Sequence, residues 1–223
     1  MMLLEIENLK KSYVAPDGER NTVVNVQKFE LNKGAQVALE GHSGSGKTTF
    51  LNLIAGILQA DEGSIVLDGS EMTALPETGR DRLRAQTIGY VFQTFNLLQG
   101  YTALENVALG MMFGPGADYA HAQKLLERVG LSDRLHYRPR QLSVGQQQRV
   151  AVARALANNP KLVLADEPTG NLDRKNAREA LKLIREACTE NGAALLLVSH
   201  DHEVLSAFED VKNLSEINQT NSK

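Results

Sequence analysis

The first forty residues carry apolar side chains at the alternating spacing of half-buried strands. Leu4 and Ile6 alternate with acidic neighbours, and a second apolar series occupies residues 23–31. Residues 15–18, between the two series, contain proline and glycine in a combination that favours a turn. The pattern therefore predicts an antiparallel β region, followed by a short strand over residues 36–39.

Three later apolar runs show no alternation. They cover residues 88–92, 162–164 and 194–198, and uninterrupted runs of this length are typical of strands that are buried on both faces of a sheet. Helical spacing over residues 176–188 separates the last two runs. Strands that alternate with helices predict an α/β fold with a mainly parallel sheet.

Helical spacing also dominates the middle of the chain, where glycine or proline breaks it at residues 114–116 and 138–139. We expect residues 94–158, approximately, to form a helical subdomain that is inserted into a single domain covering residues 1–223. The polar tail over residues 213–223 is expected to fray.

Composition narrows the possible functions. The 223 residues include 24 lysines and arginines and 27 aspartates and glutamates, which gives a net charge of −3. This near balance disfavours a protein that grips nucleic acid through a broad basic face. The single cysteine, Cys188, excludes an internal disulfide and fits a reducing compartment. No apolar run approaches the roughly 20 residues that span a bilayer, so we expect any membrane span to come from a partner chain.

A glycine-rich stretch follows the strand predicted over residues 36–39 and leads into an apolar helix that includes Thr49. Glycines let consecutive backbone N–H groups turn toward a polyphosphate, Lys47 can reach its β and γ phosphates, and the Thr48 hydroxyl can bind Mg²⁺. We therefore predict a nucleotide phosphate loop that continues into Thr49. Its eight residues match the pattern GxxxxGK(S/T): Gly41, His42, Ser43, Gly44, Ser45, Gly46, Lys47 and Thr48.

Two carboxylates follow the apolar run over residues 162–164. Asp166 and Glu167 stand at the C-terminal end of this predicted strand, and ligands of open α/β sheets bind at that edge. Asp166 is suited to the coordination shell of Mg²⁺, and Glu167 to accepting a proton from the water that attacks a γ phosphate. The alternative is a polar strand exit with two solvated acids, which the neighbouring phosphate loop disfavours.

A second place for negative charge precedes the helix predicted over residues 147–157. Ser143 can cap this helix, and the N–H groups beside Gly145 and Gln146 are free to meet an anion. The residues alone favour a plain helix cap.

Residues 141–156 resemble the signature region of ATP-binding cassette (ABC) ATPases. The phosphate loop, the signature and the acidic pair occur in the order of that family, and the resemblance covers nearly the whole chain. It implies a P-loop NTPase fold in which Ser143 and Gly145 contact the γ phosphate, with Gln146 beside them. Val144 stands where the family usually has glycine, and we expect this to impair rather than abolish function.

The resemblance implies further roles, one residue at a time. Tyr13 matches the aromatic residue that stacks on adenine, and Gln93 matches the glutamine that contacts Mg²⁺ and water. Asp173 lies in the stretch that crosses the dimer interface, and His200 matches the histidine that contacts the γ phosphate. The other histidine side chains and Cys188 match no such role and are interpreted as structural.

The resemblance also implies partners. Because the chain carries one phosphate loop, one signature and one acidic pair, the resemblance predicts a homodimer that holds two ATP molecules with Mg²⁺ between its subunits. The signature of each subunit would close over the nucleotide of the other. The resemblance also predicts ATP hydrolysis that drives a transmembrane permease, with the chain at the cytoplasmic face of the inner membrane and no nucleic acid bound.

Residues 88–98, 102–107 and 168–173 resemble the branch of lipoprotein-releasing, macrolide-exporting and cell-division ABC ATPases. This implies export or extraction. Phe95, Leu97 and Leu98, which follow the predicted strand over residues 88–92, are candidates either for contact with the permease or for core. An importer ATPase, a soluble ABC protein of translation or DNA repair, and a regulator with little turnover remain alternatives.

Overall fold

The computed structural model describes residues 1–114 and 116–220. Its strands form two sheets, one antiparallel with the order β2-β1-β4-β5 and one parallel with the order β6-β7-β8-β3-β9. The strands are β1 (Met2–Val14), β2 (Arg20–Asn32), β3 (Gln36–Glu40), β4 (Glu62–Leu67), β5 (Ser70–Glu71), β6 (Ile88–Val91), β7 (Leu162–Asp166), β8 (Ala194–Ser199) and β9 (Asp210–Asn213).

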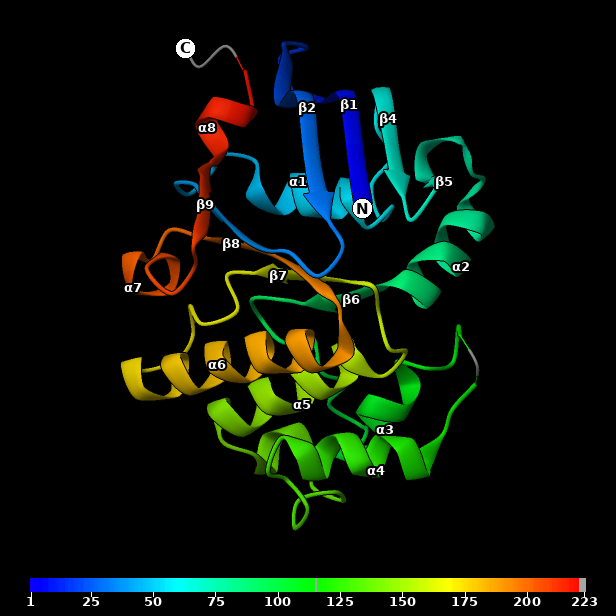
Figure 1. The fold of residues 1–223 in the computed structure, drawn as a ribbon, viewed down its shortest axis with the longest axis vertical. Helices are drawn as coiled ribbons and strands as arrows, with labels where there is room; N and C mark the ends of the chain where they lie inside the picture. The colour runs from blue at the N-terminus through cyan, green and yellow to red at the C-terminus, as the bar shows by residue number, and fades with distance from the viewer. Residues whose placement is uncertain (115, 221–223) are drawn as a thin grey trace.

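The helices lie on both faces of the parallel sheet. The helices are α1 (Lys47–Ile54), α2 (Glu77–Thr87), α3 (Ala103–Leu109), α4 (Tyr119–Arg128), α5 (Val144–Leu156), α6 (Arg174–Asn191), α7 (His202–Leu205) and α8 (Leu214–Ile217), with 3₁₀ turns at Met72–Ala74 and Pro139–Gln141. In Figure 1, α1 lies between the two sheets, whereas α5 and α6 cover the opposite face of the parallel sheet and α4 lies farther out.

The parallel sheet separates two hydrophobic cores. Leu164 and Leu196 point into the core that contains α1 and the antiparallel sheet. Val163 and Leu195, their neighbours along β7 and β8, point into the core formed with α5 and α6. Since both faces of these strands are covered, both sets of alternating positions must be apolar, and this explains the uninterrupted apolar runs in the sequence.

The segment with helical spacing contains α3, α4 and α5, which all lie between residues 94 and 158. Phe95 and Leu97 are buried in the core that this segment shares with the parallel sheet, so the structure supports the core alternative for these two residues. Leu98 has 49% of its surface exposed and stays available for such a contact. Pro115, one of the expected breaks, lies outside the described residues.

The helix predicted over residues 147–157 is α5, and it begins three residues earlier than predicted, at Val144. The Ser143 hydroxyl accepts a hydrogen bond from the Gln146 N–H (3.3 Å), and Gln146 Oε1 accepts one from the Ser143 N–H (2.9 Å). This reciprocal capping box fixes the start of the helix. The signature residues after Ser143 therefore form the first turn of α5 rather than a loop before it.

The tail does not fray as expected. Residues 210–213 form β9, which pairs in parallel with β3, and Leu214 in α8 is only 1% exposed. Asn218 is also buried, because its amide makes hydrogen bonds with the backbone of β2 and of the glycine-rich loop. The polar composition of the tail gave no sign of these contacts. A polar amide can nevertheless be buried when all its donors and its acceptor make hydrogen bonds. Residues 221–223 of the tail lie outside the described part of the chain.

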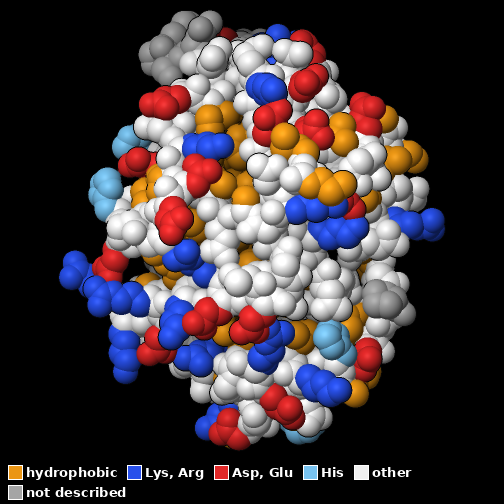
Figure 2. Space-filling view, viewed as in Figure 1, with side chains coloured by type: hydrophobic (Ala, Val, Ile, Leu, Met, Phe, Trp, Pro, Cys, Tyr) orange, Lys and Arg blue, Asp and Glu red, His pale blue; other side chains and the backbone are white. Residues whose placement is uncertain are grey.

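The surface mixes both signs of charge. Figure 2 shows acidic and basic side chains interspersed over one face, in keeping with the net charge of −3. Within residues 1–114 and 116–220, no helix combines the length and the apolar character needed to cross a bilayer.

A glycine in β6 makes the contact between the sheet and α5 possible. A Cβ atom at Gly89 would lie 2.2 Å from the carbonyl oxygen of Ala155. We expect Gly89→Ala to lower the free energy of unfolding by about 1–3 kcal/mol, measured by urea denaturation, because the helix must move away from the strand. Gly100→Ala is the control, since a Cβ there meets no atom within 4 Å. Equal stability of the two variants would contradict this account of the packing.

Candidate active site

The glycine-rich loop connects β3 to α1 and takes a backbone conformation that its glycines permit. Gly44 and Gly46 have φ angles of 81° and 88°, and a Cβ at Gly46 would lie 2.7 Å from the carbonyl oxygen of Val23. No side chain caps the N-terminus of α1, which begins at Lys47. The N–H groups of its first turn are therefore available to an anion held by the loop.

Lys47 links this loop to the acidic pair after β7. Its side chain is buried, and Nζ donates hydrogen bonds to the carbonyl oxygens of Gly41 (2.6 Å) and His42 (2.9 Å). The same Nζ lies 3.3 Å from Oε1 of Glu167. The ammonium group is thus fixed beside the loop by oxygen atoms alone. Phosphate oxygens can take the place of these partners, because an ammonium group only donates hydrogen bonds.

Glu167 is the centre of the cluster. It is 7% exposed and has a φ of 44°, an uncommon conformation for a residue with a side chain and one that is concentrated at functional sites. Its Oε2 accepts a hydrogen bond from Ser199 Oγ (3.1 Å), and its Oε1 lies 2.6 Å from Nδ1 of His200. The structure therefore brings together Lys47, Glu167 and His200, the three residues predicted to be catalytic.

Ser199 also belongs to this cluster, although the sequence did not predict it as a site residue. It is fully buried as the last residue of β8, and besides contacting Glu167 its hydroxyl accepts a hydrogen bond from the Asp201 N–H (3.1 Å). The available signal was its position, since it ends a buried strand immediately before His200 and the carboxyl ends of parallel strands meet at one edge of the sheet.

Asp166, the last residue of β7, has the features of a cation ligand. It is 5% exposed, and within the described residues its Oδ1 has no hydrogen-bond partner. Burial raises the pKa of this carboxyl group above its usual value; the Thr48 hydroxyl and the Lys47 charge oppose that effect, and the neighbouring Glu167 adds to it. A buried carboxylate oxygen without a partner, next to a threonine hydroxyl, fits a hard divalent cation.

Gln93, the third predicted metal ligand, lies in the loop after β6. Its carbonyl oxygen accepts a hydrogen bond from Asn171 Nδ2 (2.7 Å), which ties this loop to the one before α6. Asp173 caps α6, because its side chain accepts hydrogen bonds from the N–H (3.0 Å) and side-chain amide (2.5 Å) of Asn176. These bonds lower the pKa of Asp173. A Cβ at Gly170, in the loop before α6, would lie 3.5 Å from the Glu167 carbonyl oxygen and 3.6 Å from Gln93 Nε2, so both loops lie next to the Glu167 cluster.

The signature residues lie on the other side of the parallel sheet. Ser143, Gly145 and Gln146 are at the N-terminus of α5, whereas the glycine-rich loop leads into α1 on the opposite face (Figure 1). A Cβ at Gly145 would lie 3.1 Å from Asn176 Oδ1, and Val144 is 47% exposed. A single chain therefore keeps its two predicted anion-binding elements apart.

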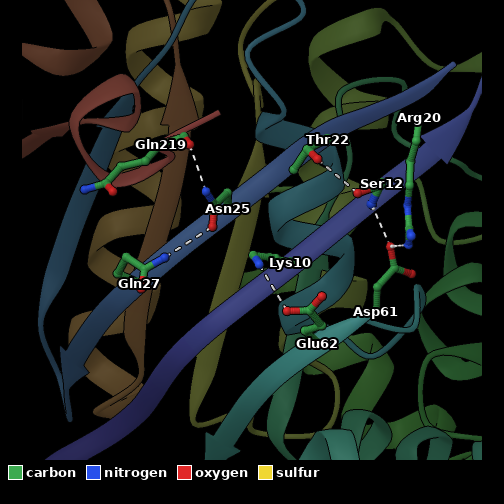
Figure 3. Close-up of polar contacts among 9 residues, drawn as sticks. All are labelled: Lys10, Ser12, Arg20, Thr22, Asn25, Gln27, Asp61, Glu62 and Gln219. Atoms are coloured by element: carbon green, nitrogen blue, oxygen red, sulfur yellow. Dashed lines mark hydrogen bonds and ion pairs between the residues drawn. The ribbon is translucent and has the colours of Figure 1, made fainter. Parts of the chain in front are cut away.

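Tyr13 is on the antiparallel sheet, near the end of β1, with 43% of its surface exposed. Lys11 Nζ lies 5.8 Å from the centre of the ring and is held by Asp61 at 2.9 Å. Asp61 also accepts a hydrogen bond from the Ser12 N–H (2.8 Å) and pairs with Arg20 (Figure 3). This network, which sequence reasoning missed, fixes the strand that carries Tyr13 and leaves its ring accessible.

Comparisons with known proteins identify the family. The family model described as ABC transporter matches residues 24–170. The lipoprotein-releasing system ATP-binding protein LolD of Pseudomonas syringae pv. tomato is 44% identical over 216 residues, which are 95% of this chain and 94% of that protein.

Two solved structures of the cassette MJ0796 share this fold. One is a dimer in a post-hydrolysis state with ADP and phosphate (36% identity, TM-score 0.84), and the other is described as a dimeric bacterial ABC transporter cassette (36% identity, TM-score 0.86). Each match covers 95% of this chain and 94% of the other. The expected α/β P-loop fold is confirmed, and the chain belongs to the ABC transporter family, as a cassette that binds and hydrolyses ATP.

Proposed function

We propose that two copies of this chain bind ATP between them and use its hydrolysis to drive a separate transmembrane permease at the cytoplasmic face of the inner membrane. The proposed task is export or extraction, with lipoproteins as the substrate class because LolD, 44% identical, belongs to a lipoprotein-releasing system. The main support for the proposal is that the two predicted anion-binding elements are separated within one chain. The loop that contains Lys47 and the start of α5 lie on opposite faces of the parallel sheet.

A second copy is the simplest source of the missing half. A nucleotide held by the glycine-rich loop of one subunit meets Ser143 and Gly145 only if another subunit presents them. In a twofold-symmetric dimer each subunit presents the same surface to the other, so closing one such site closes a second. The dimeric MJ0796 structures support this arrangement.

Hydrolysis follows from the Glu167 cluster. We propose that phosphate oxygens replace the carbonyl oxygens of Gly41 and His42, and the Glu167 carboxylate, as partners of Lys47 Nζ. Glu167 then accepts a proton from the water that attacks the γ phosphorus, while the bond from that phosphorus to the bridging oxygen breaks and leaves ADP and phosphate. His200 and Ser199, which both contact the Glu167 carboxylate, orient it toward the water.

Mg²⁺ fits the same site. We propose that Thr48 and Asp166 hold it, with Gln93 from the adjacent loop as a further ligand, because Asp166 carries a buried oxygen without a partner in the described part of the chain. When bound, the ion neutralises charge on the β and γ phosphates.

A groove between α2, β6 and α3 is the proposed contact with the permease. Tyr90 and Phe92, whose rings stack at 4.1 Å, line its floor, and Ile57 and Phe113 lie at its rim, with 46% and 80% of their surfaces exposed. Exposed hydrophobic side chains at the rim of such a groove, an aromatic one among them, are typical of protein interfaces.

Co-expression with a transmembrane permease tests the proposal. We expect the two chains to purify together and the permease to stimulate ATP hydrolysis. Phe113→Ser should weaken capture about tenfold, a loss of about 1.4 kcal/mol, and leave the ATPase rate of the isolated chain unchanged. Met112→Ser is the matched control, because Met112 is also exposed and does not line the groove. Stimulation by nucleic acid or ribosomes, with no permease retained, would overturn the proposal.

A further inference from the structure

The C-terminal segment packs against the back of the glycine-rich loop. Asn218, which follows α8, is 7% exposed, and its Nδ2 donates hydrogen bonds to the carbonyl oxygens of Val23 (2.9 Å) and Ser45 (3.2 Å). Its Oδ1 accepts a hydrogen bond from the Asn25 N–H (2.7 Å). One amide therefore connects three segments: α8, β2 and the loop itself.

Neighbouring contacts fix the position of this amide. The Gln219 N–H donates to the Asn25 carbonyl oxygen (2.9 Å), and Asn25 Nδ2 donates to the Gln219 carbonyl oxygen (2.9 Å; Figure 3). On the other side, the Asn218 N–H donates to the Leu214 carbonyl oxygen (2.7 Å), and Leu214 is buried in the core around α1. The Asn218 side chain is thus held from both directions along the chain.

The hydrogen bond to Ser45 bears on the part of the loop that would face a phosphate. In a trans peptide unit the C=O and N–H bonds point in opposite directions. Holding the Ser45 carbonyl toward Asn218 therefore turns the N–H of Gly46 away from Asn218. Asn218 also occupies the space next to Gly46, where a Cβ would lie 3.3 Å from Nδ2.

We propose that Asn218 is a positioning residue for ATP binding, acting through the orientation of the Ser45–Gly46 peptide. The proposal rests on the assignment of this loop as the phosphate site. Asparagine suits the role because the position needs two donors and one acceptor at once. Asn218 touches none of Lys47, Glu167 and His200 through the bonds described above, so it sets affinity for ATP and leaves the hydrolytic step unchanged.

Asn218→Asp is the main test, because aspartate keeps the shape and the acceptor for Asn25 but loses both donors. We expect the KM for ATP, and the Kd for ATP measured without turnover, to rise about tenfold while kcat stays within twofold of the parent. Asn218→Ala should show the same split and serves as a second variant. A merely structural role would lower thermal stability and leave KM unchanged.

Asn25→Ala is the matched control. It removes the side-chain bond to Gln219, and so loosens the same C-terminal segment, but keeps the backbone N–H that faces Asn218. We expect a lower unfolding temperature with an unchanged KM. Equal KM values for the Asn218 and Asn25 variants would overturn the proposal. The Kd readout separates this failure from that of the proposed function, since it needs neither a permease nor hydrolysis.

Discussion

Glu167→Gln is expected to lower the rate of ATP hydrolysis at least about a hundredfold and to leave ATP binding intact, because a general base typically contributes a factor of 10²–10⁴. The amide has the shape of the carboxylate but cannot take the proton of the attacking water. It also removes the negative charge that lies 3.3 Å from Lys47 Nζ, so the affinity for ATP should stay equal or increase. Bound ATP should then hold the protein as a dimer, detected by size-exclusion chromatography.

Glu209→Gln is the control for this experiment, because Glu209 is an exposed carboxylate immediately before β9, outside the cluster. It should keep the parent rate. If the Glu167 variant hydrolysed ATP at the parent rate, Glu167 would not be the general base. Loss of ATP binding together with hydrolysis would instead give it a structural role in holding Lys47 and His200.

The sequence predicts the parts of this site that depend on local pattern. The spacing of Gly41, Gly46 and Lys47 marks the loop, because few other arrangements let consecutive N–H groups turn inward. Asp166 and His200 each follow a buried apolar run, with one residue between the run and the site residue. Parallel strands bring their carboxyl ends to one edge of the sheet, so these two residues are expected at the same edge. The meeting of Lys47, Glu167 and His200 follows from these two facts.

Contacts between distant segments were not predictable in the same way. The bond from Asn218 to Ser45 joins positions 173 residues apart, and nothing in a polar tail indicates which backbone group it will meet. β4 was missed for a similar reason, since only Ile65 and Leu67 of its residues are buried and its stability comes from pairing with β1. Such contacts depend on the register of strands that the local pattern leaves open.

Lys47→Met is expected to lower the affinity for ATP at least about a hundredfold, since a charge-assisted contact to phosphate is lost. It should also destabilise the protein without nucleotide. Lys47 and Glu167 are both buried, and removing one partner of a buried ion pair typically costs about 3–5 kcal/mol because the other charge loses its compensation. Urea denaturation measures this second effect and calorimetric titration with ATP measures the first.

The double variant Lys47→Met/Glu167→Gln separates the two roles of this lysine. Replacing the carboxylate by a neutral amide removes the uncompensated charge, so stability should return most of the way while ATP affinity stays low. Lys161→Met controls for loss of a lysine in general, since Lys161 pairs with Asp68 at the exposed surface, where ion pairs contribute about 0–1 kcal/mol. If Lys47→Met were as stable as the parent, Lys47 and Glu167 would not form an energetically coupled pair, and the idea that ATP binding releases Glu167 from Lys47 would fail.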